Sequence, residues 1–380
     1  MTVVLKLGSL VATMAERGAT PNVSPLRRRV LKAAGVLFTP LLPDDYLELI
    51  NPLWSTRELR GRVERIQRET DDAATVLIRP GWDWGGHEPG QYLRIGVVVD
   101  GKHHWRAYSI TSDPGREDGF ISITPKLVGS GVVSPHLVRT LTPGAIVRLG
   151  GVEGTFTLPD RLPAKMLFIS AGSGITPIMS MLRDLDHRGE LRDVVHVHSA
   201  RTLDEVIFGG DLRAIAARHD GFELHEQHTA EHGRLGPRDL DRICPDWRER
   251  ETFISGPADL LDEHLELWDA DPEADPDRVH LERFQPKIGG EGSGGEGGTI
   301  TFLKSDKEVE APGDQPILVS GEEAGLELPF GCRMGICHTC VGKLCSGKLR
   351  DLRTGEVHGK DGEVVRTCIN APEGPVVIEL

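Results

Sequence analysis

Four cysteines near the C-terminus constrain the fold of this chain more than any other feature. Their spacing is C-x4-C-x2-C-x27-C, formed by Cys332, Cys337, Cys340 and Cys368. Three thiolates on one loop and a fourth from a distant segment can wrap a small iron–sulfur cluster, whereas structural zinc sites favour C-x2-C pairs. Gly335, inside the loop, lets backbone N–H groups turn toward the cluster's sulfides. The spacing therefore predicts that these four thiolates hold a [2Fe–2S] cluster, with zinc as the competing metal.

The remaining cysteines and the charge balance exclude other classes of protein. Six cysteines in 380 residues are too few for a disulfide scaffold. We expect Cys345 to be a structural thiol rather than a ligand, and Cys244 to be a small buried hydrophobic residue. With 44 Lys and Arg against 58 Asp and Glu, the net charge is −14. Such a field repels phosphate backbones, so we expect no nucleic-acid partner.

Residues 56–160 contain short β-type runs separated by clusters of Gly, Pro and Asp. This pattern predicts an antiparallel barrel. One helical window, Ser134–Leu141, interrupts it. The expected strands are Arg62–Ile66, Thr75–Ile78, Tyr92–Val99, Trp105–Ile110 and Gly119–Thr124.

Residues 161–285 instead alternate apolar strands with amphipathic helices. The expected strands are Met166–Ser170, Val194–His198, Glu223–His228 and Thr252–Ser255. The expected helices are Pro177–Asp186, Asp211–His219 and Ala258–Ala270. This βαβ pattern predicts a parallel sheet, which binds ligands at the carboxyl ends of its strands.

A glycine-rich segment separates these residues from the cysteine-bearing region. Residues 289–298 contain seven glycines in ten positions, and we expect residues 286–298 to be a flexible linker that buries nothing. The chain then divides into an N-terminal extension (1–55), two domains (56–160 and 161–285), the linker and a third domain (299–380).

The N-terminal 55 residues differ in charge from the rest of the chain. They carry a net charge of +2, which leaves −16 for the remainder. The arginine run 27–29 precedes an apolar stretch, Ala33–Pro43, that is too short to span a membrane. This resembles a twin-arginine export signal, but no small-residue cleavage site follows. We expect a cytoplasmic protein whose helical extension either packs on the body or contacts the inner face of a membrane or a membrane-bound partner.

A strand of the expected barrel ends in a motif suited to a flavin. Arginine supplies a charge for pyrophosphate, tyrosine an aromatic face and serine a hydroxyl, and a later glycine turn opens a helix whose N–H groups favour phosphate. The predicted flavin-binding residues are Arg106, Tyr108, Ser109, Thr111, Lys126, Gly131, Val133 and Ser134. Together they resemble the FAD-binding barrel of the ferredoxin–NADP reductase superfamily. The resemblance implies FAD, with FMN as the alternative.

A second glycine turn follows the first apolar strand of residues 161–285. Its glycines allow a diphosphate to approach the backbone, Thr176 can cap the next helix, and proline suits the first turn of that helix. The predicted nucleotide-binding residues are Gly172, Ser173, Gly174, Thr176 and Pro177. Behind a flavin-type barrel, this turn resembles the nicotinamide-binding half of the same superfamily.

The end of the next strand bears on which nicotinamide nucleotide binds. An acidic residue there favours the free ribose of NADH, whereas a hydroxyl and an arginine favour the 2′-phosphate of NADPH. Ser199 and Arg201 occupy this position, so we expect NADPH. Asp204 lies nearby and leaves NADH as the alternative.

One position departs from the pattern of the superfamily. Ser255, Gly256 and Pro257 match a late strand-and-turn motif in which the family usually has cysteine in place of Ser255. In relatives this residue lies beside the reacting nicotinamide, so the resemblance implies a catalytic position with altered geometry or rate. Phe284, in the segment that ends the nicotinamide domain, is expected to shield the flavin ring.

Residues 299–380 resemble the plant-type ferredoxin domain. The resemblance rests on the strands Ile300–Phe302 and Glu308–Ala311, the acidic helix Asp314–Ala324 and the segments 328–332 and 366–368 around the cysteines. The expected fold is therefore a β-barrel flavin domain, an α/β nucleotide-binding domain and an α+β ferredoxin domain of the β-grasp type.

The order of the domains resembles phthalate-dioxygenase-type reductases and implies an electron route from NADPH through FAD to the [2Fe–2S] cluster. The chain shows no paired carboxylate and histidine sets of the di-iron type, so we expect a separate electron-accepting oxygenase, desaturase or hydroxylase. The chain is also similar to actinobacterial oxidoreductases that serve membrane acyl-CoA desaturases in lipid metabolism. A reductase for a soluble ring-hydroxylating dioxygenase and a redox-sensing interaction module are the alternatives.

Overall fold

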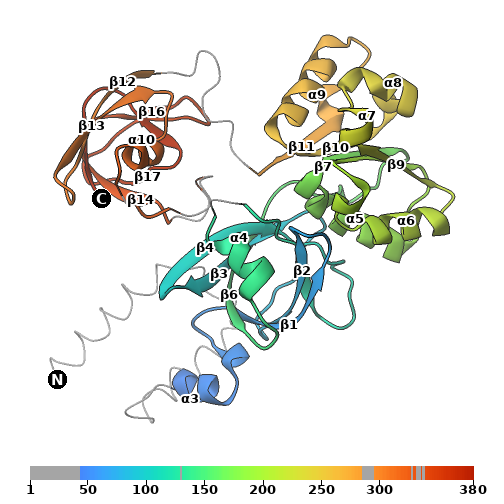
Figure 1. The fold of residues 1–380 in the computed structure, drawn as a ribbon, viewed down its shortest axis with the longest axis horizontal. Helices are drawn as coiled ribbons and strands as arrows, with labels where there is room; N and C mark the ends of the chain where they lie inside the picture. The colour runs from blue at the N-terminus through green and yellow to red at the C-terminus, as the bar shows by residue number, and fades with distance from the viewer. Residues whose placement is uncertain (1–42, 129–130, 285–294, 327, 331–334, 336–338) are drawn as a thin grey trace. The chain divides into compact units, whose positions relative to one another are not determined.

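The computed structural model describes residues 43–128, 131–284, 295–326, 328–330, 335 and 339–380 (Figure 1). The chain divides into two compact units. One contains most of the residues up to Glu282, and the other contains Arg283–Leu380 with the short segments His104–Ala107 and Gly256–Asp262. Of the expected N-terminal extension, residues 1–42 lie outside the described part. The helix α3 (Pro43–Ile50) and the 3-10 helix η1 (Pro52–Trp54) lead into the first domain.

The first domain is a six-stranded antiparallel barrel, as predicted. Its strand order is β4-β3-β6-β1-β2-β5, and a bridge between Ile110 and Ile123 joins the end of β4 to β5. Alternate residues point inward because β-strand side chains alternate between faces, and they fill a core that includes Val76, Ile78 and Ile95. The strands are β1 (Arg60–Arg68), β2 (Ala74–Pro80), β3 (Tyr92–Val99), β4 (Lys102–Ser109), β5 (Ile121–Ile123) and β6 (Ile146–Glu153).

The structure differs from the predicted barrel at strand β6 and at the helical window. The prediction missed β6, because Gly150 and Gly151 interrupt its apolar run. Gly150 is required there, since a Cβ at this position would lie 2.9 Å from the Cβ of Arg94. The predicted helical window is present as the short helix α4 (Val133–Pro135) and a π-helical turn (His136–Thr140).

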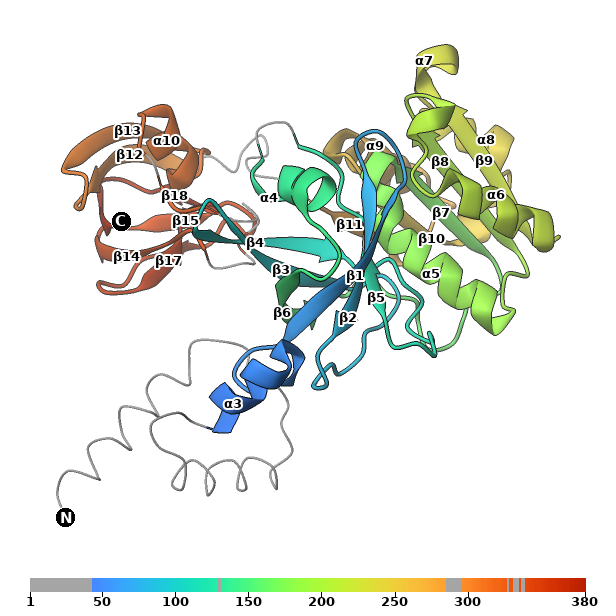
Figure 2. The ribbon, with the colours of Figure 1, turned by 60° about the horizontal axis from the view of Figure 1, so that its bottom comes forward.

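The second domain is a parallel five-stranded sheet of order β11-β10-β7-β8-β9. The pairs β7–β8, β8–β9 and β7–β10 are all parallel, as the βαβ pattern predicted. Helices α5 and α6 lie together on one face of the sheet (Figures 1 and 2). The strands are β7 (Met166–Ala171), β8 (Val194–Ala200), β9 (Phe222–His228), β10 (Glu251–Gly256) and β11 (Val279–Arg283). The helices are α5 (Ile175–Arg188), α6 (Gly209–Arg218), α7 (Thr229–His232), α8 (Leu240–Ile243) and α9 (Ala258–Ala270).

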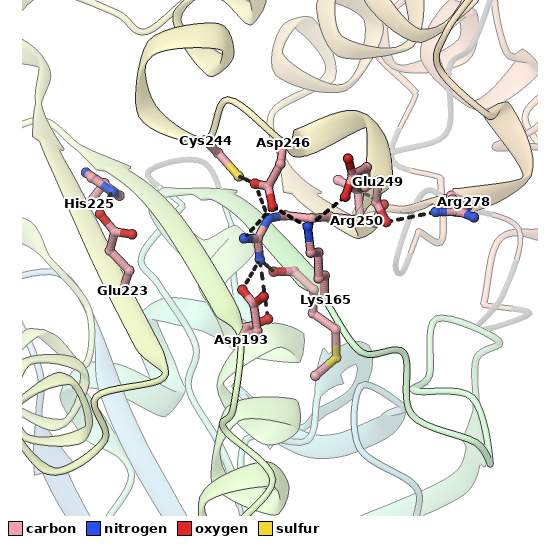
Figure 3. Close-up of polar contacts among 11 residues, drawn as sticks. Lys165, Asp193, Glu223, His225, Cys244, Asp246, Glu249, Arg250 and Arg278 are labelled. Atoms are coloured by element: carbon pink, nitrogen blue, oxygen red, sulfur yellow. Dashed lines mark hydrogen bonds and ion pairs between the residues drawn. The ribbon is translucent and has the colours of Figure 1, made fainter.

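A buried arginine ties together the amino ends of three strands of this sheet. The side chain of Arg250 is only 7% exposed and lies between Asp193 and Asp246 (Figure 3). Its Nη1 lies 2.7 Å from Asp193 Oδ1, and its Nε lies 2.7 Å from Asp246 Oδ1. Nη1 also donates to the backbone carbonyls of Met166 and Asp193, each at 3.3 Å.

These contacts leave the charges at the amino edge paired with one another. The Arg250 guanidinium holds the pKa of Asp246 well below its usual range, and Lys165 Nζ donates to the same carboxylate at 2.9 Å. Cys244, predicted to be a small buried residue, is 2% exposed, and burial raises the pKa of its thiol to about 12. We therefore assign this edge of the sheet a structural role.

The C-terminal domain has the predicted α+β fold. Its main sheet has the order β13-β12-β19-β14-β17. Strands β12 and β19, which come first and last along the chain in this domain, pair in parallel. Helix α10 (Ile317–Glu323) packs its buried residues into the core with Ile300 and Phe302. The strands are β12 (Gly295–Phe302), β13 (Lys307–Gly313), β14 (Val341–Ser346), β17 (Val364–Arg366) and β19 (Val376–Glu379), with β15 (Leu349–Asp351), β16 (Val357–His358) and β18 (Asn370–Pro372) in a second, small sheet.

The expected end of the glycine-rich linker was wrong. Residues 295–298, predicted to be flexible, form the start of β12 and pair with β13, with Gly298 opposite Ala311. These glycines are needed for close packing rather than for flexibility. A Cβ at Gly298 would lie 2.2 Å from the carbonyl oxygen of Gly374, and Gly297 is buried with φ +68°. Composition alone does not distinguish these two uses of glycine.

We predict that Gly298→Ala destabilises the C-terminal domain by about 2–4 kcal/mol, because the added methyl group overlaps the backbone at Gly374. Urea unfolding of the full chain, followed by loss of the cluster's visible absorption, measures the effect. The matched control is Glu296→Ala, since Glu296 is exposed in the same strand. Equal midpoints for the two variants would show that residues 295–298 are only a linker.

Candidate functional site

The glycine turn at the carboxyl end of β7 leaves the start of α5 without a side-chain cap. Gly172, Ser173 and Gly174 form the 3-10 helix η3, and Gly172 has φ +53°, a conformation that favours glycine. The predicted capping role of Thr176 was wrong: its hydroxyl donates to the carbonyl of Ser173 at 2.9 Å. Pro177 lies in the first turn of α5, as predicted. Among the described residues no side chain caps this helix start, and its free N–H groups suit a diphosphate.

A row of buried polar residues crosses the carboxyl edge of the sheet beside this turn. Ser255 pairs in register with Ser170, Ser170 with His198, and His198 with Glu226. Ser255, Ser170 and His198 are at most 1% exposed. Paired residues of parallel strands point to the same face, so these side chains form one continuous polar band.

A serine hydroxyl at the centre of the band bonds to two histidines. Ser170 Oγ lies 2.9 Å from His196 Nε2 and 2.7 Å from His198 Nδ1. Burial first, and then the charges of Lys126 and His228, lower the pKa of His198 to about 4. Burial and His198 also lower the pKa of His196. Both rings are therefore neutral at pH 7, and because one hydroxyl donates only one proton, it donates to one ring and accepts from the other.

Several atoms of this band have no hydrogen-bond partner among the described residues. They include Ser255 Oγ, His198 Nε2 and Glu226 Oε1, each buried. A buried polar atom without a partner costs about 1–3 kcal/mol, so such groups normally meet a ligand or water. The carboxyl edge thus fits a polar ligand such as a nicotinamide nucleotide, whose amide and hydroxyl groups supply the missing partners. Gly256 ends β10 next to Ser255, and Pro257 is exposed beyond it.

The end of β8 carries the two residues predicted to select the nucleotide. Ser199 pairs with Ala171, immediately before the glycine turn. Arg201 follows β8 and forms an ion pair with Glu205, with Nε and Nη2 at 2.9 and 2.7 Å from the same carboxylate oxygen. Asp204 was the predicted acidic neighbour, and the structure shows that Glu205 is the acid in contact with Arg201.

The predicted flavin-binding residues lie on the barrel and the loops at its edge. On β4, Arg106 and Tyr108 are half-buried and Ser109 is buried. Thr111 is fully buried, and its hydroxyl bonds to Ser122 Oγ at 2.8 Å and Thr124 Oγ1 at 3.3 Å inside the barrel. Its role as a cofactor ligand stays a prediction.

The second group of predicted flavin-site residues lies between the end of β5 and the end of α4. Lys126 Nζ lies 3.4 Å from Asp72 Oδ2, so the carboxylate compensates part of the positive charge of the lysine. Gly131 N–H donates to Val128 O at 2.9 Å, and Ser134 Oγ accepts from Val128 N–H at 3.0 Å. The helix then begins at Val133, where no side chain caps it. The two cations, Arg106 and Lys126, and the aromatic face of Tyr108 are a suitable set of groups for a flavin with a diphosphate.

Helix α5 connects the two nucleotide sites directly. Ser180 Oγ donates to the carbonyl of Ser112 at 2.8 Å, and Arg183 Nη1 donates to the carbonyl of Thr111 at 2.5 Å. These carbonyls follow the flavin motif of β4, and α5 starts at the glycine turn of the second site. Because the acceptors are backbone groups, the contact fixes the position of the loop itself.

Sequence reasoning named Phe284 but missed its neighbour Glu282. Phe284 is half-buried after β11. Glu282 is half-buried in β11, and burial raises the pKa of its carboxyl to about 7. Burial first, and then the carboxylates of Glu153 and Glu282, raise the pKa of Tyr92 on β3. The only sequence signal was an acidic residue inside an otherwise half-apolar strand, which is too common to indicate a site.

Two of the four predicted cluster ligands lie in the described part of the third domain. Cys340 and Cys368 are each 1% exposed and belong to its core. The N–H of Gly335 donates to Cys368 Sγ at 3.2 Å, and Gly335 has φ +73°. An N–H bond to sulfur stabilises a thiolate that ligates iron, so these residues fit a cluster. Cys332 and Cys337 lie outside the described residues. Cys345 is half-buried on β14 with its Sγ 3.7 Å from Lys343 O.

Three family models match the chain in the order of its domains. Residues 85–158 match an oxidoreductase FAD-binding domain, residues 168–273 an oxidoreductase NAD-binding domain, and residues 300–373 a 2Fe-2S iron-sulfur cluster binding domain. These matches confirm the predicted fold and its FAD, NADPH and [2Fe–2S] cofactors. The domain boundaries and the individual ligands stay predictions.

Known proteins with the same domains are similar over most of the chain. The NADPH oxidoreductase of Mycobacterium tuberculosis is 45% identical, over 98% of this chain and 97% of its own length. The glycine betaine monooxygenase reductase subunit of Pseudomonas aeruginosa is 31% identical, over 77% of this chain and 87% of its own length. The solved structure of phthalate dioxygenase reductase has the same fold, with a TM-score of 0.55 at 20% identity over 84% of this chain and 97% of that one.

We predict that serine in place of Cys332, Cys337, Cys340 or Cys368, one at a time, removes most of the cluster, because each substitution deletes a thiolate ligand. Iron and acid-labile sulfide content and the visible spectrum measure the loss. Cys345→Ser is the matched control and keeps the full content. Full iron and sulfide in any of the four variants would contradict the assignment of that cysteine.

We also predict that Glu282→Gln stabilises the protein increasingly as the pH rises. The folded-state pKa is raised from 4.5 to about 7, so the penalty for ionising this carboxyl grows through that window and is complete above it. The shift corresponds to about 3 kcal/mol at pH 8.5 and roughly half of that at pH 5.5.

Urea unfolding of the full chain at these two pH values measures the difference. Glu266→Gln, which removes the same charge from an exposed position of α9, is the control. A stabilisation by Glu282→Gln that does not change between pH 5.5 and pH 8.5 would argue against a buried carboxyl.

Proposed function

Because the chain belongs to the ferredoxin–NADP reductase superfamily, fused to a C-terminal [2Fe–2S] ferredoxin domain, we propose that it supplies electrons to a separate, membrane-bound di-iron acyl-CoA desaturase. The chain is an NAD(P)H-dependent flavin and iron–sulfur oxidoreductase. When bound, a nicotinamide nucleotide would supply electrons in pairs, and a flavin and a cluster would allow them to leave singly toward the acceptor. What remains to be assigned is that acceptor.

Residues of the chain hold these groups in the following way. The uncapped start of α5 and the polar band of Ser255, Ser170 and His198 bind and orient the nucleotide, and burial of the band excludes water. Arg106, Tyr108 and Lys126 hold the flavin. The four cysteines hold the cluster, with the N–H of Gly335 directed at one sulfur.

The names of similar proteins support an oxygen-activating acceptor. The Pseudomonas aeruginosa relative is named as the reductase subunit of a monooxygenase. Its similarity covers 77% of the present chain, whereas that of the Mycobacterium tuberculosis relative covers 98% and therefore includes the N-terminal segment. The extension is thus shared with a protein named NADPH oxidoreductase.

The first described elements support a membrane-bound acceptor. Leu49 and Ile50, at the end of α3, are 77% and 72% exposed, and Trp54 in η1 and Trp82 are also exposed. The +2 charge of residues 1–55 contrasts with −16 in the rest of the chain. Exposed aliphatic and indole groups suit a membrane interface. The basic residues of this stretch all precede residue 33, outside the described part, whereas α3 itself carries three carboxylates, Asp44, Asp45 and Glu48. Within the described residues, no helix is long and apolar enough to cross a membrane.

A soluble oxygenase component is the second candidate acceptor, favoured by the name of the Pseudomonas aeruginosa relative. The two candidates differ in whether the N-terminal region contributes to electron delivery. The rate of electron delivery to a membrane-bound acceptor depends on the exposed residues of α3, whereas the rate of delivery to a soluble acceptor does not depend on them.

The test is reconstitution with membranes that carry a di-iron acyl-CoA desaturase and no reductase of their own. We predict NADPH-dependent desaturation with the wild-type chain, and a three- to tenfold lower rate with Leu49→Gln/Ile50→Gln, because the change removes about two apolar contacts with the bilayer surface. Cytochrome c reduction in solution stays unchanged.

Val98→Gln, at an exposed apolar position on the barrel, is the matched control and keeps the wild-type rate. Absence of desaturation, together with rapid reduction of a soluble oxygenase component, would overturn the proposal and favour the second candidate.

A further inference from the structure

The ion pair between Arg201 and Glu205 places an acid at the position where the nucleotide is selected. Both Nε and Nη2 of Arg201 contact Oε1 of Glu205, at 2.9 and 2.7 Å. The arginine side chain is 74% exposed and that of the glutamate 26% exposed, so the pair is open to a ligand from one side. Arg201 directly follows β8, the second strand of the βαβ unit, where the adenosine ribose binds in this class of fold.

Backbone hydrogen bonds hold this pair in place. The carbonyl of Arg201 accepts from Ala230 N–H at 2.9 Å, which ties it to the segment after β9. The N–H of Glu205 donates to the carbonyl of Thr202 at 3.1 Å within the 3-10 helix η4 (Leu203–Glu205). These bonds fix the backbone of both residues four positions apart, which keeps the carboxylate within reach of the guanidinium.

A 2′-phosphate and a 2′-hydroxyl interact with opposite members of such an ion pair. A phosphate needs the guanidinium donors and is repelled by a neighbouring carboxylate, whereas a ribose hydroxyl donates well to a carboxylate. Two Arg201 donors are directed at Glu205, so a phosphate must displace the carboxylate or share the guanidinium with it.

We propose that Glu205 is a specificity-determining residue that weakens selection of NADPH and keeps NADH usable. The inference rests on the proposed function as an NADPH-dependent reductase and names the residue that limits its preference. Asp204 has the same charge and is adjacent in sequence, but it is exposed and the structure gives it no contact with Arg201. The effect therefore belongs to Glu205 and not to acidity in general.

The test compares Glu205→Gln with Asp204→Asn, which removes the same charge one residue away. Calorimetric titration of the holoenzyme with adenosine 2′,5′-bisphosphate and with adenosine 5′-monophosphate gives the ratio of affinities without any turnover. Steady-state kcat/KM for NADPH and NADH, with ferricyanide as acceptor, gives the same ratio for the complete cofactors.

We expect Glu205→Gln to raise the preference for the 2′-phosphorylated probe three- to tenfold and Asp204→Asn to change it less than twofold. With Arg201→Ala in the background, the effect of Glu205→Gln becomes smaller, because the released donors are absent and only the direct effect of the carboxylate on the ribose remains. Equal ratios for Glu205→Gln and Asp204→Asn would overturn the inference. Failure of the desaturase assay would leave these binding ratios unaffected, so the two proposals fail separately.

Discussion

The burial of Arg250 at the amino edge of the parallel sheet is the interaction on which the geometry of the functional site depends. It bonds to the start of β7 and to the residue before β8, and it directly precedes β10. Glu251, Met166 and Val194 therefore align as the first row of the sheet, and four residues later the same register aligns Ser255, Ser170 and His198. A one-residue slip that brings the preceding residue into this row would replace Ser255, Ser170 and His198 by Ile254, Ile169 and Val197, because side chains alternate between faces.

The two edges of the sheet use polar groups in opposite ways. At the amino edge, Arg250, Asp193, Asp246 and Lys165 satisfy one another. At the carboxyl edge, Ser255 Oγ and His198 Nε2 are buried without a partner among the described residues. The free energy lost by leaving such atoms unpaired is recovered when a ligand or water reaches them. This asymmetry locates the ligand-binding edge from the chain's own residues, independently of any similarity to known proteins.

How far the sequence predicts this arrangement depends on whether a feature is local. Continuous apolar runs such as Met166–Ser170 and the spacing of the cysteines are local, and they predicted the parallel sheet and the cluster domain. The packing of Gly298 against Gly374 and the contact of Arg201 with Glu205 depend on how the backbone folds, and sequence reasoning assigned flexibility to the first and considered Asp204 for the second. The raised pKa of Glu282 could be recognised only in the folded structure, since the desolvation of a carboxyl depends on the residues that surround it.

The contacts of helix α5 join the loop after the flavin strand to the start of the nucleotide site. Transfer of an electron pair between two bound rings requires them to be held in contact, and small displacements reduce the rate steeply. Ser180 and Arg183 of α5 bond to the carbonyls of Ser112 and Thr111, so the helix that starts at the nucleotide site is fixed to the loop that follows the flavin strand. Because both acceptors are backbone atoms, substitutions in that loop keep the connection as long as its path is unchanged.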